Sequence, residues 1–130
     1  MTDELLRRTA GRRYPEDKLQ RAIVEYLDWS LPDDAVVFAV PNGGKRHARE
    51  AARMKGLGVK AGIPDLCIVW RGKALFIEVK AIRGVLAQEQ RAMIHKLEYC
   101  GSLVWVARSV EQVELVLRDA GVPLLAALAA

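Results

Sequence analysis

The stretch from residue 62 to residue 80 constrains the fold most, because it has two apolar arms around a short polar turn. The arms are Leu66–Trp70 and Ala74–Val79, and both are rich in β-branched and aromatic residues. The turn between them, Arg71-Gly72-Lys73, contains a glycine. Apolar arms of this kind joined by a short glycine-containing loop predict a β-hairpin.

Three charged residues lie at the open end of this predicted hairpin. Asp65 opens the first arm, whereas Glu78 and Lys80 stand two residues apart near the end of the second. Alternate residues of a strand project from the same face, so Glu78 and Lys80 are expected on one face. Folding back at Gly72 brings Asp65 opposite Glu78, to within one residue of register. Two carboxylates and an ammonium group should therefore meet at one end of a hydrophobic hairpin.

This cluster has two interpretations. Burying an unpaired charge costs several kcal/mol, so a strand as apolar as this one needs a partner for Glu78. The first interpretation is a structural ion pair between Lys80 and Glu78 or Asp65, a common and mostly idle arrangement. The second is a site for a hard cation such as Mg²⁺, which carboxylate oxygens bind and which substrate phosphate can complete.

The order of motifs resembles a known nuclease group. Pro64-Asp65 followed by Glu78-Val79-Lys80 resembles the signature of the PD-(D/E)XK nuclease superfamily. The wider context is similar to the virus-type replication-repair nuclease (VRR-NUC) family over about residues 15 to 121. The matching segments, in order, are Pro41-Asn42-Gly43-Gly44, Gly62-Ile63-Pro64-Asp65-Leu66, Ile77-Glu78-Val79-Lys80 and Gln90.

The resemblance implies a metal-dependent nuclease with a restriction-endonuclease-like core. Asp65, Glu78 and the carbonyl of Val79 would bind Mg²⁺ or Mn²⁺, and Lys80 would position or activate water. Gln90 would orient Lys80.

The first predicted helix carries two further candidates. Pro15 and the acidic residues after it predict a helix to about Trp29. Its inward stripe contains two polar residues, Glu16 and Gln20, whereas Glu25 falls on the opposite face. A boundary salt bridge is the plain explanation for such residues. In the resembling family, a Glu and a Gln here approach the metal site, which implies that Glu16 and Gln20 would supply an outer ligand or a water contact.

The whole chain predicts an α/β fold in the order α-β-α-β-β-α-β-α, a mixed four-stranded sheet flanked by helices. We expect Ala35–Val40 to be a strand buried on both faces, and Leu103–Ala107 another buried strand. A helix over about 87–99 has Gln90 in its core stripe, where the amide needs hydrogen-bond partners. Ser109 is expected to cap the last helix.

Basic residues suggest how a polyanion would bind. The net charge of +4 and the pI near 9.3 suit nucleic acid, though only mildly. Glycines after the first strand free backbone N–H groups to approach an anion. An ordinary turn before a solvated helix is the alternative. The candidate DNA-binding residues are Asn42, Gly43, Gly44, Lys45, Arg46, Arg49 and Arg53.

We expect one domain with two appendages. Residues 1–13 would be a flexible basic arm, 14–121 the nuclease domain and 122–130 an apolar tail. The tail either packs on its own core or contacts a second subunit, and we favour a homodimer. No signal peptide or membrane span is visible. Cys67 and Cys100 are expected to be reduced core residues in a cytoplasmic protein, and a bacterial or phage origin fits the compact form.

These observations predict a structure-selective DNA endonuclease, with Holliday-junction or other branched DNA as leading substrate. Three alternatives stay open. One is a non-catalytic DNA-binding module, the second a flap or duplex nuclease that needs a partner. The third is a structural or interaction protein whose carboxylates merely pair with lysine.

Overall fold

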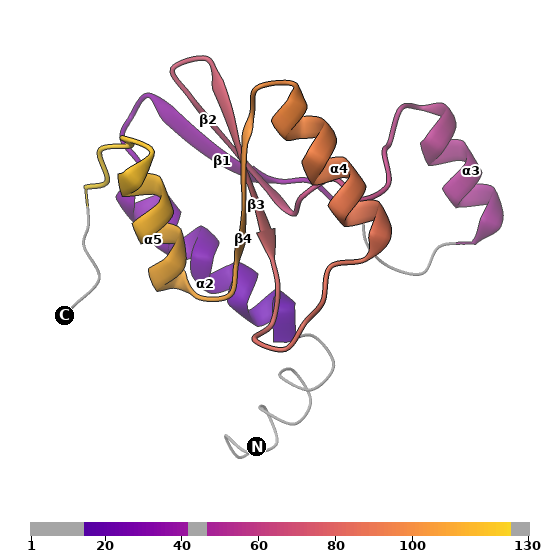
Figure 1. Cartoon of the computed structure of the whole chain (residues 1–130), viewed down its shortest axis with the longest axis horizontal. Coiled ribbons are helices and arrows are strands. Elements are labelled where there is room, and N and C mark those ends of the chain that lie inside the picture. Colours follow the sequence, from indigo (N-terminus) through magenta and orange to yellow (C-terminus); the bar gives the residue numbers. More distant parts are fainter. Residues whose placement is uncertain (1–14, 42–46, 126–130) are drawn as a thin grey trace.

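The computed structural model describes residues 15–41 and 47–125, in which a four-stranded sheet carries helices on both faces (Figure 1). The elements follow the predicted order: α2 (Pro15–Ser30), β1 (Ala35–Ala39), α3 (Ala48–Gly56), β2 (Leu66–Trp70), β3 (Lys73–Val79), α4 (Gln88–Tyr99), β4 (Leu103–Ala107) and α5 (Val110–Asp119). The α/β fold class and the mixed sheet flanked by helices are therefore confirmed.

The predicted hairpin forms the centre of the sheet, whose strand order is β1-β2-β3-β4. The pairs β1–β2 and β2–β3 are antiparallel, whereas β3 and β4 are parallel. The turn is tighter than predicted, because Lys73 already belongs to β3. Its two residues, Arg71 and Gly72, have φ angles of 50° and 75°. Positive φ at both central positions is the geometry of a type I′ turn, which matches the twist of paired strands.

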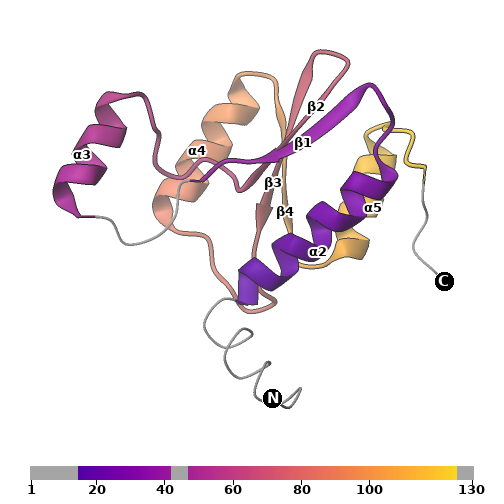
Figure 2. The ribbon, with the colours of Figure 1, turned by 180° about the vertical axis from the view of Figure 1, so that it is seen from behind.

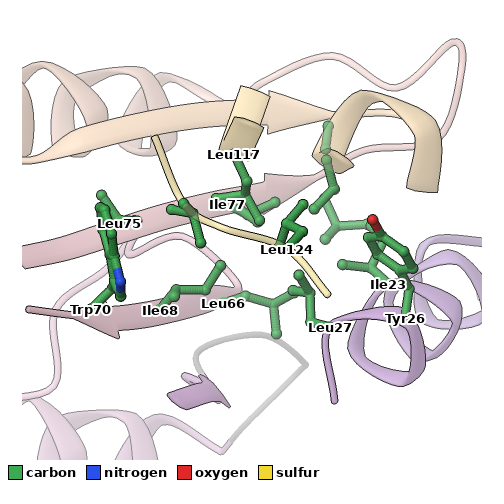
Figure 3. Close-up of a cluster of buried hydrophobic side chains, with 14 residues drawn as sticks. Ile23, Tyr26, Leu27, Leu66, Ile68, Trp70, Leu75, Ile77, Leu117 and Leu124 are labelled. Atoms are coloured by element: carbon green, nitrogen blue, oxygen red, sulfur yellow. The ribbon is translucent and has the colours of Figure 1, made fainter. Parts of the chain in front are cut away.

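Helices α2 and α5 cover one face of the sheet and enclose the main core (Figure 3). Every second residue of β2 and β3 points into this core, as the strand period requires. Ile23 and Leu27 of α2 and Leu117 of α5 pack against these residues and are fully buried. The strand residues of the core are Leu66, Ile68, Trp70, Leu75, Ile77 and Val79.

Helix α4 lies on the opposite face of the sheet, next to β4. Helix α3 stands apart from the sheet in both views, on the far side of α4 (Figures 1 and 2). It has no buried residue, so packing does little to hold it.

Two expectations about the strands are wrong. Both β1 and β4 are edge strands, and neither is buried on both faces. Val36 and Phe38 of β1 are 54% and 47% exposed, and Leu103 of β4 is 47% exposed. An apolar run shows that a segment is a strand, but strand order decides how far it is covered.

Beyond α5, the first residues of the apolar tail pack on the domain's own core. Val122 and Leu124 are buried, and the N–H of Leu125 donates to the carbonyl of Ser30. Residues 126–130 of the tail and the basic arm at 1–13 lie outside the described residues. Cys67 is buried as expected, but Cys100 is exposed because the end of α4 faces solvent. Within 15–41 and 47–125, no helix is long and apolar enough to cross a membrane.

Candidate active site

The register of the hairpin brings the two carboxylates together. Leu66 pairs with Ile77, so the next position along places Asp65 across from Glu78. The Asp65 carboxylate is held there, because its Oδ2 accepts a hydrogen bond of 2.8 Å from the N–H of Val79. A carboxylate just before the start of β2 thus accepts from the backbone at the end of β3, where the two strands separate.

Glu78 projects from β3 away from the main core and toward α4. Its side chain is only 1% exposed. Its Oε1 accepts a hydrogen bond of 3.1 Å from Nε2 of Gln90, whose own Oε1 accepts from the N–H of Ala87 at 2.8 Å. The other oxygen, Oε2, is buried and has no hydrogen-bond partner among the described residues. Gln90 therefore orients Glu78 and not Lys80, which differs from our expectation.

The surroundings of Glu78 disfavour its charged form. Burial raises the pKa of Glu78 to about 8, and the negative charges of Asp65 and, to a smaller extent, Glu16 act in the same direction. The Lys80 ammonium opposes this shift. A carboxyl group whose pKa is this far from the usual value of 4.5 is typical of functional sites.

Lys80 is the first residue beyond β3, and 8% of it is exposed. Its Nζ lies 3.8 Å from Oε1 of Glu16 in the first turn of α2. Its N–H donates to the carbonyl of Ala107 in β4 at 3.0 Å. The peptide between residues 79 and 80 is trans, so the Val79 carbonyl points the opposite way, toward the side where Asp65 lies.

Of the two candidate residues on α2, only Glu16 reaches the cluster. Glu16 and Gln20 are half-buried on the inward side of α2, and Glu25 is exposed. Glu16 reaches the cluster through Lys80. Gln20 instead lines a surface groove with Arg21, Val24, Glu25, Asp28 and Trp29, and in the described part of the chain no hydrogen bond joins it to the site.

The oxygen atoms around Glu78 could serve as ligands for a metal ion. No group of three or more His, Cys, Asp or Glu side chains within the described ranges could hold a metal. Asp65 and Glu78 form a pair, which the carbonyl of Val79 would complete. The buried Oε2 of Glu78 has no hydrogen-bond donor, and a cation would both satisfy this oxygen and stabilise the ionised carboxylate. The oxygen ligands fit Mg²⁺ or Mn²⁺.

Of the candidate DNA-binding residues, those at 42–46 lie outside the described residues. Arg49 and Arg53 both lie on the exposed helix α3. Arg53 forms an ion pair with Glu50, with 3.3 Å between Nη2 and Oε1. Arg49 is therefore the better placed of the two to contact a phosphate.

Two residues that shape the site had no role assigned from the sequence. Gly62 has a φ angle of 80°, and a Cβ atom there would clash with the backbone of Glu89 in α4. Arg108 follows β4 and hydrogen-bonds to the carbonyls of the loop after Lys80. A glycine just before Pro64-Asp65 and an arginine ending the last strand were the available signals, but neither carries chemistry alone.

Comparisons with known proteins identify the family and support the fold. The model of the VRR-NUC domain family matches residues 2–111. A solved structure described as a VRR_NUC domain protein is 24% identical, with a TM-score of 0.59 over 80% of this chain and 85% of that one. A second, described as a VRR_NUC domain, is 21% identical, with a TM-score of 0.54 over 79% and 94%. No curated protein matches the sequence. With most of its length matched, the chain belongs to the VRR-NUC family of nuclease domains.

Proposed function

We propose that this domain is a Mg²⁺- or Mn²⁺-dependent endonuclease that cuts branched DNA, including Holliday junctions, as a homodimer. The observation that supports it most is the carboxylate of Glu78. This group is buried against Asp65, one oxygen is fixed by Gln90, and the other has no partner among the described residues. A purely structural carboxylate would be expected to have both oxygens satisfied or exposed.

Asp65, Glu78 and the Val79 carbonyl would hold the cation. A bound divalent ion supplies stabilisation of negative charge on the phosphate and lowers the pKa of an attacking water. Asp65 is positioned for this by the Val79 N–H, which donates to its Oδ2. Gln90 fixes the Glu78 carboxylate in the same way.

Lys80 supplies the positive charge of the site. Its ammonium is largely buried and lies near Glu16, so it keeps donors for a water molecule or a phosphate oxygen. In the proposed hydrolysis, water attacks phosphorus and the bond to the 3′ oxygen breaks, which leaves a 3′-hydroxyl and a 5′-phosphate. Lys80 would hold the water or neutralise the charge that develops on the phosphate.

The substrate preference rests on the basic segment from Asn42 to helix α3. Exposed arginines on α3 suit contacts with the DNA backbone, which carry no sequence information. Few side chains near the site are suited to reading base edges, which favours structure-selective cutting. A two-fold dimer would place two such sites for symmetric cuts across a junction.

The test is a cutting assay on labelled four-way junction, flap and matched duplex in Mn²⁺. We expect symmetric junction cuts that EDTA and Lys80→Ala both abolish. Lys73→Ala is the matched control, because Lys73 is an exposed lysine at the far end of the same strand. Its cutting should equal that of the parent.

Other results of these experiments would favour one of the alternative functions or overturn one part of the proposal. Binding of DNA without cutting in any divalent metal would favour a DNA-binding module. Preferred cutting of flaps or duplex would retain the nuclease and overturn the junction preference. A monomer at tens of micromolar in sedimentation would overturn the dimer.

A further inference from the structure

The side chain of Arg108 hydrogen-bonds to the backbone of the loop at residues 81–84, which has no role in the proposed site. Its Nη1 atom donates to the carbonyl oxygens of Ala81 at 2.6 Å and Gly84 at 2.8 Å, and reaches that of Ile82 at 3.3 Å. Hydrogen bonds from a charged donor are stronger than those between neutral groups. One guanidinium group therefore hydrogen-bonds to three carbonyls of the segment that follows Lys80.

The position of Arg108 in the sheet explains this contact. Val79 of β3 and Ala107 of β4 are partners in the parallel pair, so Arg108 lies beside Lys80 one residue further on. Its own backbone is fixed, because its N–H donates to Oε1 of Gln112 at 2.6 Å. Gln112 belongs to the first turn of α5, which Ser109 caps, because its Oγ accepts a hydrogen bond of 3.1 Å from the N–H of Gln112.

The loop has little else to hold it. Ile82 is 81% exposed and Val85 is 77% exposed, so neither anchors it in the core. Inside the loop, the N–H of Gly84 donates to the carbonyl of Ala81 at 2.9 Å. A segment with few buried apolar contacts opens readily unless polar bonds restrain it. The bonds from Arg108 supply that restraint.

The loop in turn lies against Glu16. A Cβ atom at Gly84 would stand 3.4 Å from Oε1 of Glu16, the same oxygen that lies 3.8 Å from Nζ of Lys80. The connection from β3 to α4 passes the start of α2 in both views (Figures 1 and 2). A shift of residues 81–84 would therefore change the space that Glu16 and the Lys80 ammonium share.

We infer that Arg108 is a positioning residue for the proposed nuclease reaction, acting through the loop at 81–84 on Glu16 and Lys80. This rests on the proposed function of the site. Arg108 need not touch the substrate for this role. It acts by keeping the ammonium of Lys80 in its working position, and small misplacements of a reacting group are enough to slow catalysis strongly.

The kinetic test compares three variants. Arg108→Ala should lower kcat by about 10- to 100-fold with little change in KM, and Arg108→Lys should restore part of the loss. Arg91→Ala is the matched control, because Arg91 donates to the carbonyl of Leu86 at 2.8 Å, at the other end of the same connection. It should stay within about twofold of the parent, since its bond holds a carbonyl outside residues 81–84.

Chemical rescue separates positioning from a general loss of stability. Arg108 lines a surface groove with Leu86, Val106, Gln112, Leu115 and Val116, so a small cation can reach its place. Millimolar guanidinium should raise kcat of Arg108→Ala severalfold, whereas the same concentration of sodium chloride should not. Equal kcat for Arg108→Ala and parent, or a loss shared by Arg91→Ala, would overturn the inference.

A measurement without DNA keeps this test separate from that of the proposed function. Amide hydrogen exchange at residues 82–86 should be faster in Arg108→Ala and Arg108→Gln than in the parent, with exchange in the core strands unchanged. Faster exchange together with a parent that cuts no DNA would count against the nuclease and not against the restraint. Unchanged exchange in both variants would overturn the restraint itself.

Discussion

An acidic and a basic side chain meet at each end of the β2–β3 hairpin. The pair at the turn is exposed to solvent, whereas the pair at the open end lies in a largely buried cluster. At the turn, Nε of Arg71 lies 3.3 Å from Oδ2 of Asp34, and the two side chains are 67% and 53% exposed. At the other end, Lys80 pairs with Glu16 beside Glu78, which is 1% exposed. The same two strands thus support a solvated ion pair and a buried acidic centre.

Burial, and not the proximity of charges alone, distinguishes the two ends of the hairpin. Water around Arg71 and Asp34 screens their attraction, which is worth about 0–1 kcal/mol in such pairs. At Glu78, the removal of water is the main cause of the raised pKa, and the charge of Asp65 adds to it. Of these two pairs of charges, only the second lies beside a carboxyl group whose pKa is raised by burial.

The largest expected effect is on catalysis at the buried end. Glu78→Gln keeps the shape and can still bond to Gln90, but it removes the negative charge. We expect cutting to fall by about 100- to 1000-fold, the usual cost of removing one group that organises charge stabilisation. Single-turnover cutting in Mn²⁺ measures this.

The control for that variant lies at the turn. Arg71→Gln removes a charge from the same hairpin and should leave the cutting rate within about twofold of the parent, as surface changes away from a site usually do. A similar loss of cutting in Glu78→Gln and Arg71→Gln would contradict the assignment of cutting to the buried end alone.

The second effect is on stability as the pH changes. The pKa of Glu78 is about 8 in the folded protein, whereas the ordinary value expected for the unfolded chain is 4.5. The folded state therefore holds a proton that the unfolded state releases. This contribution to stability is fully present below the unfolded pKa, and it is lost as pH rises toward about 8.

In EDTA, the Tm should accordingly fall by several degrees between pH 5 and pH 8.5. Glu78→Gln should flatten this fall. Mn²⁺ should raise the Tm of the parent most at pH 8, because the ionised carboxylate is the form that binds a metal. An equal Tm with and without Mn²⁺ at pH 8 would argue for a structural carboxyl and against a metal site.

The smallest effect is expected from the exposed pair. Asp34→Ala removes its partner from Arg71 but leaves the guanidinium over the Trp70 ring, 5.2 Å from its centroid. The free energy of unfolding should change by less than about 0.5 kcal/mol. Urea denaturation at two salt concentrations measures this, and a change above about 1.5 kcal/mol would contradict the assignment of this pair as solvated.

Local patterns predicted most of the fold. Turn chemistry and the strand period placed the hairpin and brought Asp65 opposite Glu78, because both signals lie within 20 residues of chain. The inward stripe of α2 likewise placed Glu16 on the inside and Glu25 on the outside. In these cases, one element's own periodicity decides which way a side chain points.

What the sequence could not predict depends on contacts between distant elements. Val36 and Phe38 are exposed because β1 lies at the edge of the sheet, and the sequence of one strand does not determine its place in the strand order. The amide of Gln90 was expected on Lys80 and bonds to Glu78, because the distance of α4 from the sheet decides its partner. Arg108 bonds to carbonyls 24 to 27 residues earlier in the chain, and carbonyls have no signature in the sequence.

The glycine at position 62 has a consequence for how this domain can vary. Its Cα lies so close to the Glu89 carbonyl that no side chain fits between the segment leading into β2 and helix α4. The spacing of these two elements beside the acidic centre is thus set by contact of main chain with main chain. A change of side-chain size elsewhere need not alter that spacing, whereas any side chain at position 62 itself would force the two elements apart.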